Sequence, residues 1–456
     1  MKTQKIYDII GIGIGPFNLG MAALAAPLED LSAIFFDQAP VFNWHPGMML
    51  SDVTLQVPFM ADLVTLADPT SPYSFLNFMK QTDRLYKFYI REDFYILRKE
   101  YNAYCKWVID KLPSCQFNQK VLSTAYDEAE QYYKLIVEDQ RNLEKQTFYT
   151  RKLVLGTGTI PKMPDFITPG KHPKVIHTSE YLNYKNELLK QQSVSIIGSG
   201  QSAAEIFSDL LPETENGLEL KWFTRPDRFF PMEYSKLTLE LTSPEYVDHF
   251  YNLPDEKRKQ VLSKQNSLFK GINYDLINQI FDKLYELSVD GEEPNVKLSP
   301  NCQLNGITTT ADGRSDLHFY HTEIEKEFVQ QTDFVVVATG YKYKEPAFLK
   351  GINHRISRNK DNLYSVGRNY AIDINNNEVF VQNAELHTHG FVTPDLGMGA
   401  YRNSSIINTV LGREAYRVEK KIAFQSFGMA AADEINNPLK EILETETGIL
   451  SANINI

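Results

Sequence analysis

The chain has 456 residues, of which 43% are hydrophobic, 12% aromatic and 23% charged. This is the composition of a globular protein too long for one ordinary core, so we expect two or three domains. No run approaches the roughly eighteen apolar residues of a membrane span, and the first residues lack a secretory h-region. A net charge of −11 disfavours nucleic acid and anionic membrane as partners.

The three cysteines, Cys105, Cys115 and Cys302, are an odd number and show no CxxC spacing. They suit a reducing cytoplasm and argue against a metal site or a redox dithiol. The acidic charge is compatible with a cationic small substrate, although solubility alone is the simpler explanation. We therefore expect a cytoplasmic protein without a metal.

The first predicted strand–turn–helix unit lies at residues 6–26, and its turn reads GIGPFN. In such turns the first glycine permits the tight bend, and the second lets the backbone approach a pyrophosphate at the helix N-terminus. The next strand, 33–36, is followed by an acid that can accept from both ribose hydroxyls. Glycines also end ordinary strands, but the strand and helix around this turn favour the adenosine of FAD. The predicted contacts are Gly13, Gly15, Pro16, Asn18 and Asp37.

A second unit of the same kind lies at residues 194–211, with the turn GSGQSAAE. The strand after it, 218–224, is followed by Arg225 instead of an acid. An arginine can pair with a 2′-phosphate that an acid would repel, so this unit favours NADPH over NADH. An arginine on the surface at a strand end is the alternative interpretation. The predicted contacts are Gly198, Gly200, Gln201, Ser202 and Arg225.

Further strands at 153–155 and 334–338 are continuous apolar runs, typical of buried parallel strands. The predicted fold is therefore α/β, with two Rossmann-like dinucleotide-binding domains and a small, mostly helical segment on the substrate side. We assign residues 1–165 and 345–456 to a discontinuous FAD-binding domain. Residues 190–344 form the NADPH-binding domain and include the helical segment 235–291.

Several longer motifs resemble those of the N-hydroxylating flavin monooxygenases, such as the lysine and ornithine N-hydroxylases of hydroxamate siderophore biosynthesis. The resemblance extends from Asp8 to about Asn408. Besides the two glycine turns, it rests on the segment 56–75 (QVPF … DPTSPYSF), on Asp333 with the sequence ATGY at 338–341, and on HTHG at 387–390. Within the family, the chain most resembles the branch that acts on putrescine or cadaverine.

The resemblance implies a reaction with FAD, NADPH and O₂. NADPH reduces the flavin, O₂ forms a C4a-hydroperoxyflavin shielded by NADP⁺, and the neutral amine of the substrate attacks its distal oxygen. It also implies that Gln56 lies near the flavin and that Asn273 bridges NADP⁺ and the amine. An N-cap of a helix is the alternative role for Asn273. Further cofactor contacts are implied at Thr339, Gly340 and Tyr341.

Three positions depart from the amino-acid hydroxylases, which must hold an α-carboxylate. Ala61 stands where those enzymes have a lysine that pairs with the carboxylate, Ser243 where an asparagine is expected, and Gly397 where a serine is expected. Losing one partner of a desolvated ion pair costs about 3–5 kcal/mol. Together the changes favour a substrate without a carboxylate, unless another group binds it.

A diamine brings a second ammonium, which favours a carboxylate or an aromatic cage. Glu233, Tyr234 and Asp395 are candidates for it by position. Other interpretations remain: an L-lysine N6- or L-ornithine N5-hydroxylase, an oxygenase of thioethers or ketones, a disulfide reductase, and a flavin-binding protein without turnover. A disulfide reductase needs a close cysteine pair, which Cys105 and Cys115 do not provide. We also expect a homo-oligomer, either a dimer or a tetramer.

Overall fold

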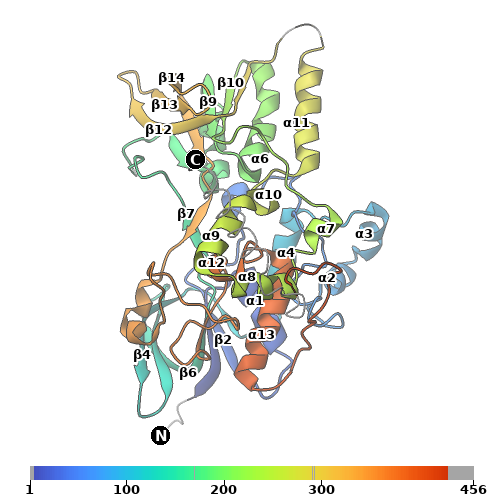
Figure 1. The fold of residues 1–456 in the computed structure, drawn as a ribbon, viewed down its shortest axis with the longest axis vertical. Helices are drawn as coiled ribbons and strands as arrows, with labels where there is room; N and C mark the ends of the chain where they lie inside the picture. The colour runs from blue at the N-terminus through green and yellow to red at the C-terminus, as the bar shows by residue number, and fades with distance from the viewer. Residues whose placement is uncertain (1–4, 169, 290, 292, 430–456) are drawn as a thin grey trace, which may run out of the picture.

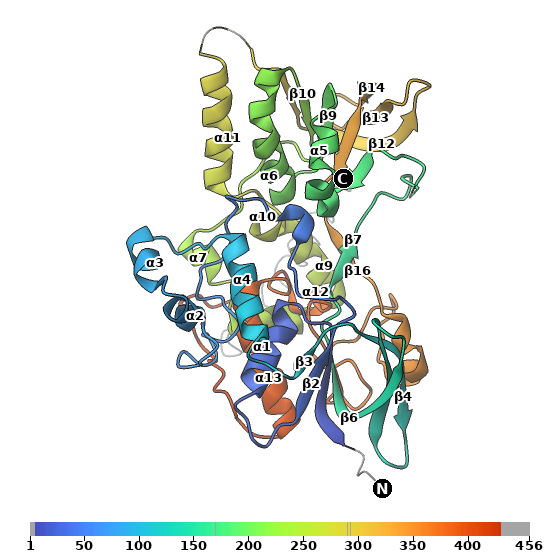
Figure 2. The same ribbon diagram turned by 180° about the vertical axis from the view of Figure 1, so that it is seen from behind.

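The computed structural model describes residues 5–168, 170–289, 291 and 293–429. The chain folds into two lobes, each built on a mostly parallel sheet, and helices lie between them (Figures 1 and 2). Strands β7 (Thr159–Pro161) and β16 (Tyr341–Tyr343) form an antiparallel pair in the connection between the lobes. The predicted α/β class with two Rossmann-like units is confirmed.

The first sheet has the order β3-β2-β1-β6-β5-β4, and β17 pairs with the end of β6. Its parallel part begins with the predicted first unit, and the antiparallel β4–β5 hairpin extends it on one side. The strands are β1 (Ile6–Ile12), β2 (Ala33–Phe36), β3 (Cys115–Gln116), β4 (Gln119–Asp127), β5 (Tyr132–Asp139), β6 (Lys145–Leu155) and β17 (Val379–Val381). Helices of this lobe are α1 (Pro16–Ala25), α2 (Phe75–Gln81), α3 (Leu85–Arg91), α4 (Arg98–Ile109), α12 (Leu386–His389) and α13 (Gly399–Leu411).

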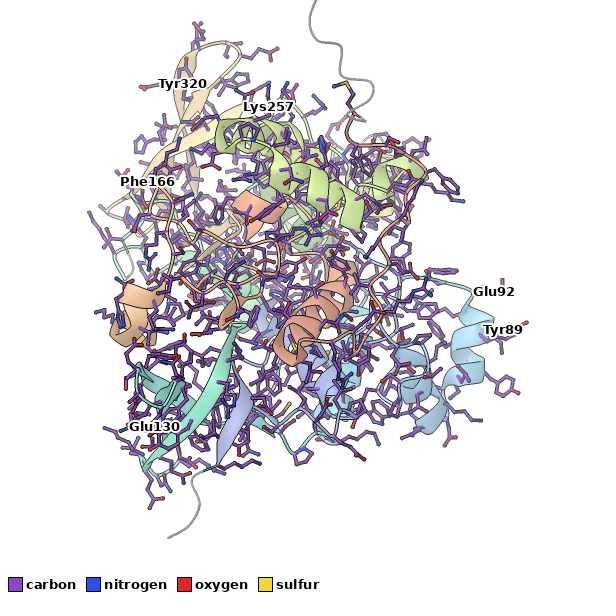
Figure 3. All side chains as sticks on the ribbon, turned by 60° about the horizontal axis from the view of Figure 1, so that its bottom comes forward. Tyr89, Glu92, Glu130, Phe166, Lys257 and Tyr320 are labelled. Carbon is purple, nitrogen blue, oxygen red and sulfur yellow. The ribbon has the colours of Figure 1, made fainter. Side chains whose placement is uncertain are left out.

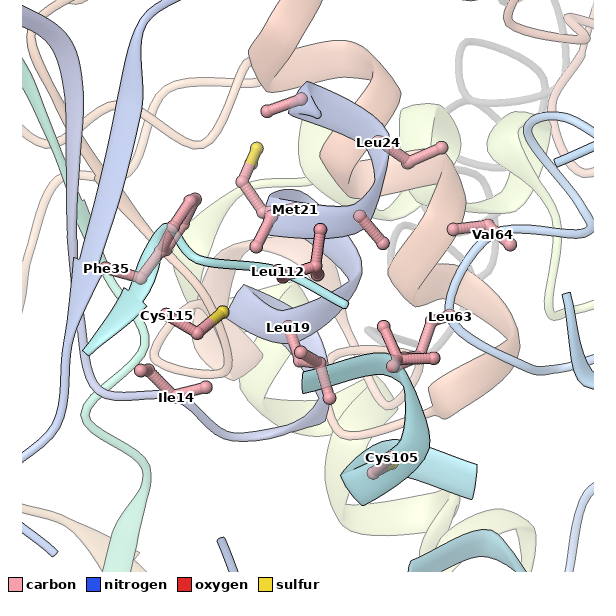
Figure 4. Packing of buried hydrophobic residues seen from close by; sticks show 14 of the residues in the cluster. Ile14, Leu19, Met21, Leu24, Phe35, Leu63, Val64, Cys105, Leu112 and Cys115 are labelled. Carbon is pink, nitrogen blue, oxygen red and sulfur yellow. The ribbon is translucent and has the colours of Figure 1, made fainter. Parts of the chain in front are cut away.

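The core of this lobe forms where α1 is buried between the sheet and α4. Leu19 and Met21 of α1 pack with Phe35, and Cys105 and Cys115 belong to the same cluster (Figure 4). Burial raises the pKa of the Cys115 thiol to about 12 and that of Cys105 further still. Both thiols therefore behave as small apolar groups, which removes the disulfide reductase as an interpretation.

The second sheet is parallel throughout, in the order β11-β10-β9-β15-β8. Its strands are β8 (Val175–His177), β9 (Ser193–Ile197), β10 (Glu219–Phe223), β11 (Val296–Ser299) and β15 (Phe334–Val337). Helices α5 (Tyr181–Leu188), α6 (Gln201–Leu210) and α11 (Tyr274–Leu287) belong to this lobe, as does the antiparallel sheet β12 (Cys302–Thr309), β13 (Ser315–His321) and β14 (Lys326–Thr332). Because β8 pairs with β15, this unit begins before residue 190.

The predicted helical segment 235–291 is divided between two environments. Helices α7 (Lys236–Leu239), α8 (Pro244–Asn252), α9 (Asp255–Lys264) and α10 (Asn266–Phe269) lie between the lobes. Tyr246, Val247 and Phe250 of α8 pack there on Phe391 and Val392. Helix α11 instead packs its apolar side on α6 of the second lobe.

Tyr89 and Glu92 project outward from the α3 region (Figure 3). Within the described residues, no helix is long and apolar enough to cross a membrane. The same residues contain no cluster of acidic, histidine or cysteine side chains arranged to hold a metal. Residues 1–4 and 430–456 of the assigned FAD domain lie outside the described residues.

Candidate active site

A cavity of about 1820 Å³ opens between the lobes and the intervening helices. Pockets for one small ligand measure about 300–1,000 Å³, so this cavity has room for more than one ligand. Of the residues predicted from the sequence, the lining includes Gly15, Pro16, Asn18, Gln56, Ala61, Gln201, Ser202, Tyr341 and Gly397.

The first glycine turn is built for close approach of the backbone. Gly13 has φ +88°, and an added Cβ there would lie 2.3 Å from the carbonyl oxygen of Gly156. Asn18, at the usual third glycine, is fully buried and donates from Nδ2 to the Gly13 oxygen at 2.8 Å. Its Oδ1 accepts from Gln382 Nε2 at 2.6 Å. Gly156 supplies the space for this asparagine, since a Cβ there would lie 2.5 Å from Asn18 Nδ2.

The same turn offers what the adenosine half of FAD requires. A Cβ added at Gly15 would meet nothing within 4 Å, so the open space beside the N-terminus of α1 suits a pyrophosphate. Asp37 accepts from the backbone N–H of Ile14 at 2.7 Å and of Ala39 at 2.8 Å. These contacts fix the carboxylate at the end of β2, and each of its oxygens keeps acceptor capacity for a ribose hydroxyl.

The second turn repeats this geometry against β15. An added Cβ at Gly198 would lie 2.3 Å from the carbonyl oxygen of Ala338, and the Gly198 carbonyl accepts from Trp222 Nε1 at 2.7 Å. Thr339 Oγ1 donates to the carbonyl of Lys162, and the Gly340 carbonyl accepts from His177 Nε2 at 2.9 Å. Thr339 and Gly340 thus make hydrogen bonds in the connection between the lobes, whereas Tyr341 lines the cavity.

Arg225 follows β10 and has no acidic partner among the described residues. Burial lowers the pKa of Lys270, and the nearby Lys162 and Arg225 lower it further. Lys270 lies beside the second turn, since a Cβ added at Gly200 would lie 3.3 Å from its carbonyl oxygen. Together Lys162, Arg225 and Lys270 make this corner electropositive, which suits an anionic phosphate. Sequence reasoning missed both lysines, because they follow β7 and α10, far from each other along the chain.

We expect Arg225→Ala to weaken NADPH far more than NADH. A charge-assisted hydrogen bond contributes about 1.5–3 kcal/mol, which corresponds to ~10–100-fold in the KM for NADPH. The measurement is flavin reduction by each nucleotide at equal ionic strength. Arg228→Ala is the matched control, because Arg228 is 70% exposed and pairs with the adjacent Asp227. If the KM values for NADPH and NADH rose equally in Arg225→Ala, Arg225 would not bind the 2′-phosphate.

Among the described residues, three side chains that line the cavity have a buried polar atom without a hydrogen bond, as expected of groups that face a ligand: Gln56, Tyr234 and Gln382. Gln56 Nε2 and the hydroxyl of Tyr234 are buried without a hydrogen bond, and both residues line the cavity. An unsatisfied buried donor costs about 1–3 kcal/mol, so a partner in the cavity would stabilise both groups. The Gln56 amide therefore fits the flavin-side position that the sequence predicts for it.

Asn273 is placed at the N-cap of α11, where its Oδ1 accepts from the backbone N–H of Leu276 at 3.1 Å. Its backbone N–H donates to Gln201 Oε1 at 2.8 Å. Asn273 therefore does fill the alternative role of helix cap, and its Nδ2 group has no hydrogen-bond partner among the described residues. Asn273 does not line the cavity itself, but its partner Gln201 does.

The predicted substrate positions are only partly brought together. A Cβ added at Gly397 would lie 3.8 Å from the Cβ of Ala61 and 3.1 Å from Asp395 Oδ1. Asp395 lines the cavity, and its Oδ1 accepts from the Gly397 N–H at 2.7 Å. Ser243 is fully buried and caps α8 by accepting from the Tyr246 N–H at 3.2 Å, and it is absent from the cavity lining although its neighbours Thr242 and Pro244 belong to it.

Burial raises the pKa of Asp395, although the Gly397 N–H and Arg402 favour its charged form. Tyr234 also lines the cavity, and its pKa is raised first by burial and then by the charges of Tyr95 and Asp395. A desolvated carboxylate with one hydrogen bond is stabilised by a cation. The position of Asp395 was noted from the sequence, but only the fold shows that it adjoins Ala61.

Residues 5–343 match the family model described as L-lysine 6-monooxygenase/L-ornithine 5-monooxygenase. The chain belongs to this family. The predicted enzyme class and cofactors are thereby confirmed: this family member is an FAD- and NADPH-dependent N-hydroxylating monooxygenase.

Its relatives include enzymes of both amino acids and diamines. A putrescine N-hydroxylase of Shewanella oneidensis is 48% identical over 96% of this chain and 87% of its own length. The FAD-bound DfoA, the cadaverine monooxygenase of desferrioxamine biosynthesis in Erwinia amylovora, is 50% identical with a TM-score of 0.92, over 94% of this chain and 100% of that chain. The ornithine N-hydroxylase of Kutzneria, solved with reduced FAD, NADP⁺ and L-ornithine, shares the fold with a TM-score of 0.82 at 23% identity, over 90% of this chain and 100% of that chain.

Proposed function

We propose that this enzyme N-hydroxylates one primary amine of a small aliphatic diamine, putrescine or cadaverine, for hydroxamate siderophore biosynthesis. The observation that carries the proposal is the proximity of Ala61 to Gly397, where an added Cβ would lie 3.8 Å from that of Ala61, beside the carboxylate of Asp395. Ala61 and Gly397 offer no charge to an α-carboxylate, and the acid Asp395 lies beside them. The relatives named for putrescine and cadaverine support the same substrate class.

We assign the second ammonium of the diamine to Asp395, with the unpartnered hydroxyl of Tyr234 beside it. A charge-assisted hydrogen bond to a desolvated carboxylate is short and strong, so it orients the substrate as well as binding it. The other amine then points toward the flavin side of the cavity. Burial in the cavity favours the neutral form of that amine, because burial lowers the pKa of an alkylammonium.

FAD bound at the first glycine turn would supply the activation of O₂, with NADPH as the reductant, so that one oxygen atom of O₂ would go to the amine and the other to water. The protein residues provide position and dryness. Neither Gln56 Nε2 nor Asn273 Nδ2 has a partner among the described residues, so Gln56 can donate to the flavin side of the cavity and Asn273 can donate beside Gln201. We place this reaction in the cytoplasm and expect a homodimer or homotetramer.

The direct test is hydroxylamine formation by the purified yellow protein with NADPH in air. Putrescine or cadaverine should yield one N-hydroxylated amine. A protein that oxidises NADPH at the same rate with and without any amine, and forms no hydroxylamine, would contradict the proposal.

Asn273→Ala is expected to leave flavin reduction intact but to release more H₂O₂ per NADPH and form less hydroxylamine. The reason is loss of the Nδ2 donor between NADP⁺ and the amine, and the measurement is the ratio of the two products. The variant also loses a helix cap worth about 1 kcal/mol. Asn273→Ser separates the two effects, because serine caps a helix but is shorter. If both variants gave the wild-type ratio of H₂O₂ to hydroxylamine, Asn273 would act only as a helix cap.

A further inference from the structure

A continuous set of polar contacts leads from the first lobe to Asn273. Arg98 begins α4 of the first lobe, and Glu205 lies on α6 of the second. Their contact is bidentate, with Arg98 Nη2 to Glu205 Oε1 at 2.7 Å and Nη1 to Oε2 at 3.1 Å. The two side chains are only 13% and 1% exposed. Arg98 Nη1 also donates to the carbonyl of Met48 at 2.7 Å.

The contacts continue from the ion pair to the end of α11. Gln201 Nε2 donates to Glu205 Oε1 at 3.0 Å, and Gln201 Oε1 accepts from the backbone N–H of Asn273 at 2.8 Å. An amide with both ends bonded has one defined orientation. Any rotation of the Glu205 carboxylate therefore displaces the amide of Gln201, and with it the start of α11.

The network joins two lobes that hold different ligands. Gln201 and Arg98 both line the cavity. The two glycine turns that bind the cofactors lie on opposite lobes, so the relative placement of flavin, nicotinamide and amine depends on contacts that cross between them. The Arg98–Glu205 ion pair joins the two lobes, and it is nearly excluded from solvent. An ion pair with good geometry holds its orientation most firmly in such an environment.

We propose that Arg98 and Glu205 are positioning residues that act through Gln201 to fix Asn273 relative to the flavin lobe. The inference rests on the proposed function in one respect: the hydroxylamine formed per NADPH reports positioning only if the enzyme is an N-hydroxylase. Its structural part, the restraint of the Asn273 backbone by Glu205 through Gln201, is independent of the substrate.

The first readout is hydrogen–deuterium exchange of the protein with FAD bound. In Glu205→Met the Gln201 amide loses its acceptor, so the Asn273 N–H should exchange about tenfold faster in the peptide covering residues 271–276. Arg98→Met should show a smaller increase, because it acts one contact further away. The matched control is Arg355→Met, which removes a similarly buried partner of Glu378 (2.8 Å) far from the site. It should leave this peptide unchanged.

The second readout separates positioning from stability. Each single variant leaves a buried charge without its partner and should lower Tm, whereas the double variant Arg98→Met/Glu205→Met removes both charges and should recover Tm. Gln201 still lacks its acceptor in the double variant. Hydroxylamine formed per NADPH should therefore stay about tenfold below wild type, because misplacement near ~1 Å can cost up to ~100-fold.

If the double variant recovered both its Tm and the hydroxylamine formed per NADPH, the proposal would be overturned. The ion pair would then have only a structural role. Unchanged exchange at residues 271–276 in Glu205→Met would overturn it as well. A wild-type protein that forms no hydroxylamine contradicts the proposed function instead. In that case the exchange experiment and the affinity of each variant for NADP⁺, measured by titration, still decide the inference.

Discussion

Asp395→Asn is expected to raise the KM for putrescine and cadaverine by about 100-fold or more while leaving flavin reduction by NADPH unchanged. The amide keeps the oxygen that accepts from the Gly397 N–H at 2.7 Å, so the local backbone should hold. What is lost is the negative charge opposite the second ammonium. Leaving one member of a buried ion pair without its partner costs about 3–5 kcal/mol.

The comparison variant is Glu233→Gln, because Glu233 is also acidic, also lines the cavity and was the other acidic candidate from the sequence. Its carboxylate is exposed and accepts from the Ser235 N–H at 3.2 Å, so its removal should change KM by less than about threefold. The measurement is hydroxylamine formation at varied diamine concentration. If Glu233→Gln weakened the diamine and Asp395→Asn did not, the assignment of the second ammonium would be wrong.

Ala61→Lys is expected to suppress diamine turnover by about 100-fold, since it places a cation in a pocket that binds a cation. The structure adds a specific reason: Ala61 adjoins Gly397, which adjoins Asp395 Oδ1. A lysine at 61 can pair with Asp395 and thereby occupy the position of the second ammonium. The same variant should gain at most weak lysine or ornithine activity, because Ser243 and Gly397 remain.

Ala61→Met is the matched control for Ala61→Lys, because it adds similar length without charge. Ala61 is 5% exposed, so both substitutions crowd the wall, and only the difference between them reports the charge. The measurement is hydroxylamine formation from putrescine and from lysine for each variant. Equal loss of diamine turnover in Ala61→Met and Ala61→Lys would show that volume, not charge, excludes the diamine.

The local features of the fold could be predicted from the sequence. Both glycine turns lie between a strand and a helix as expected, because the backbone of such a turn needs glycine at fixed positions within a short stretch of the chain. Strand β8 (175–177) escaped prediction, since it is short and is defined by its pairing with β15, far along the chain. The helical segment 235–291 was predicted as one unit, but α11 packs on α6 while α8 packs on the first lobe.

The candidate site was predictable where one motif supplies the chemistry, and less so where distant segments meet. Asn18 replaces the usual third glycine of the turn, and only the fold shows that Gly156, which follows β6, supplies the space for it. Arg98 gave no signal at all, because its role depends on Glu205 across the lobes. Ala61 and Gly397 were predicted separately by resemblance, and only the fold shows that they touch one wall beside Asp395.

The measurement that tests the central claim most directly is hydroxylamine product across putrescine, cadaverine, ornithine and lysine at equal concentration. NADPH consumption is not a substitute, since uncoupled oxidation would be counted as turnover. A carboxylate buried without a partner near Asp395 costs several kcal/mol, and ~2.7 kcal/mol is already about 100-fold in kcat/KM. We expect both diamines to exceed both amino acids by at least this factor. Faster hydroxylation of lysine or ornithine than of either diamine would contradict the substrate assignment.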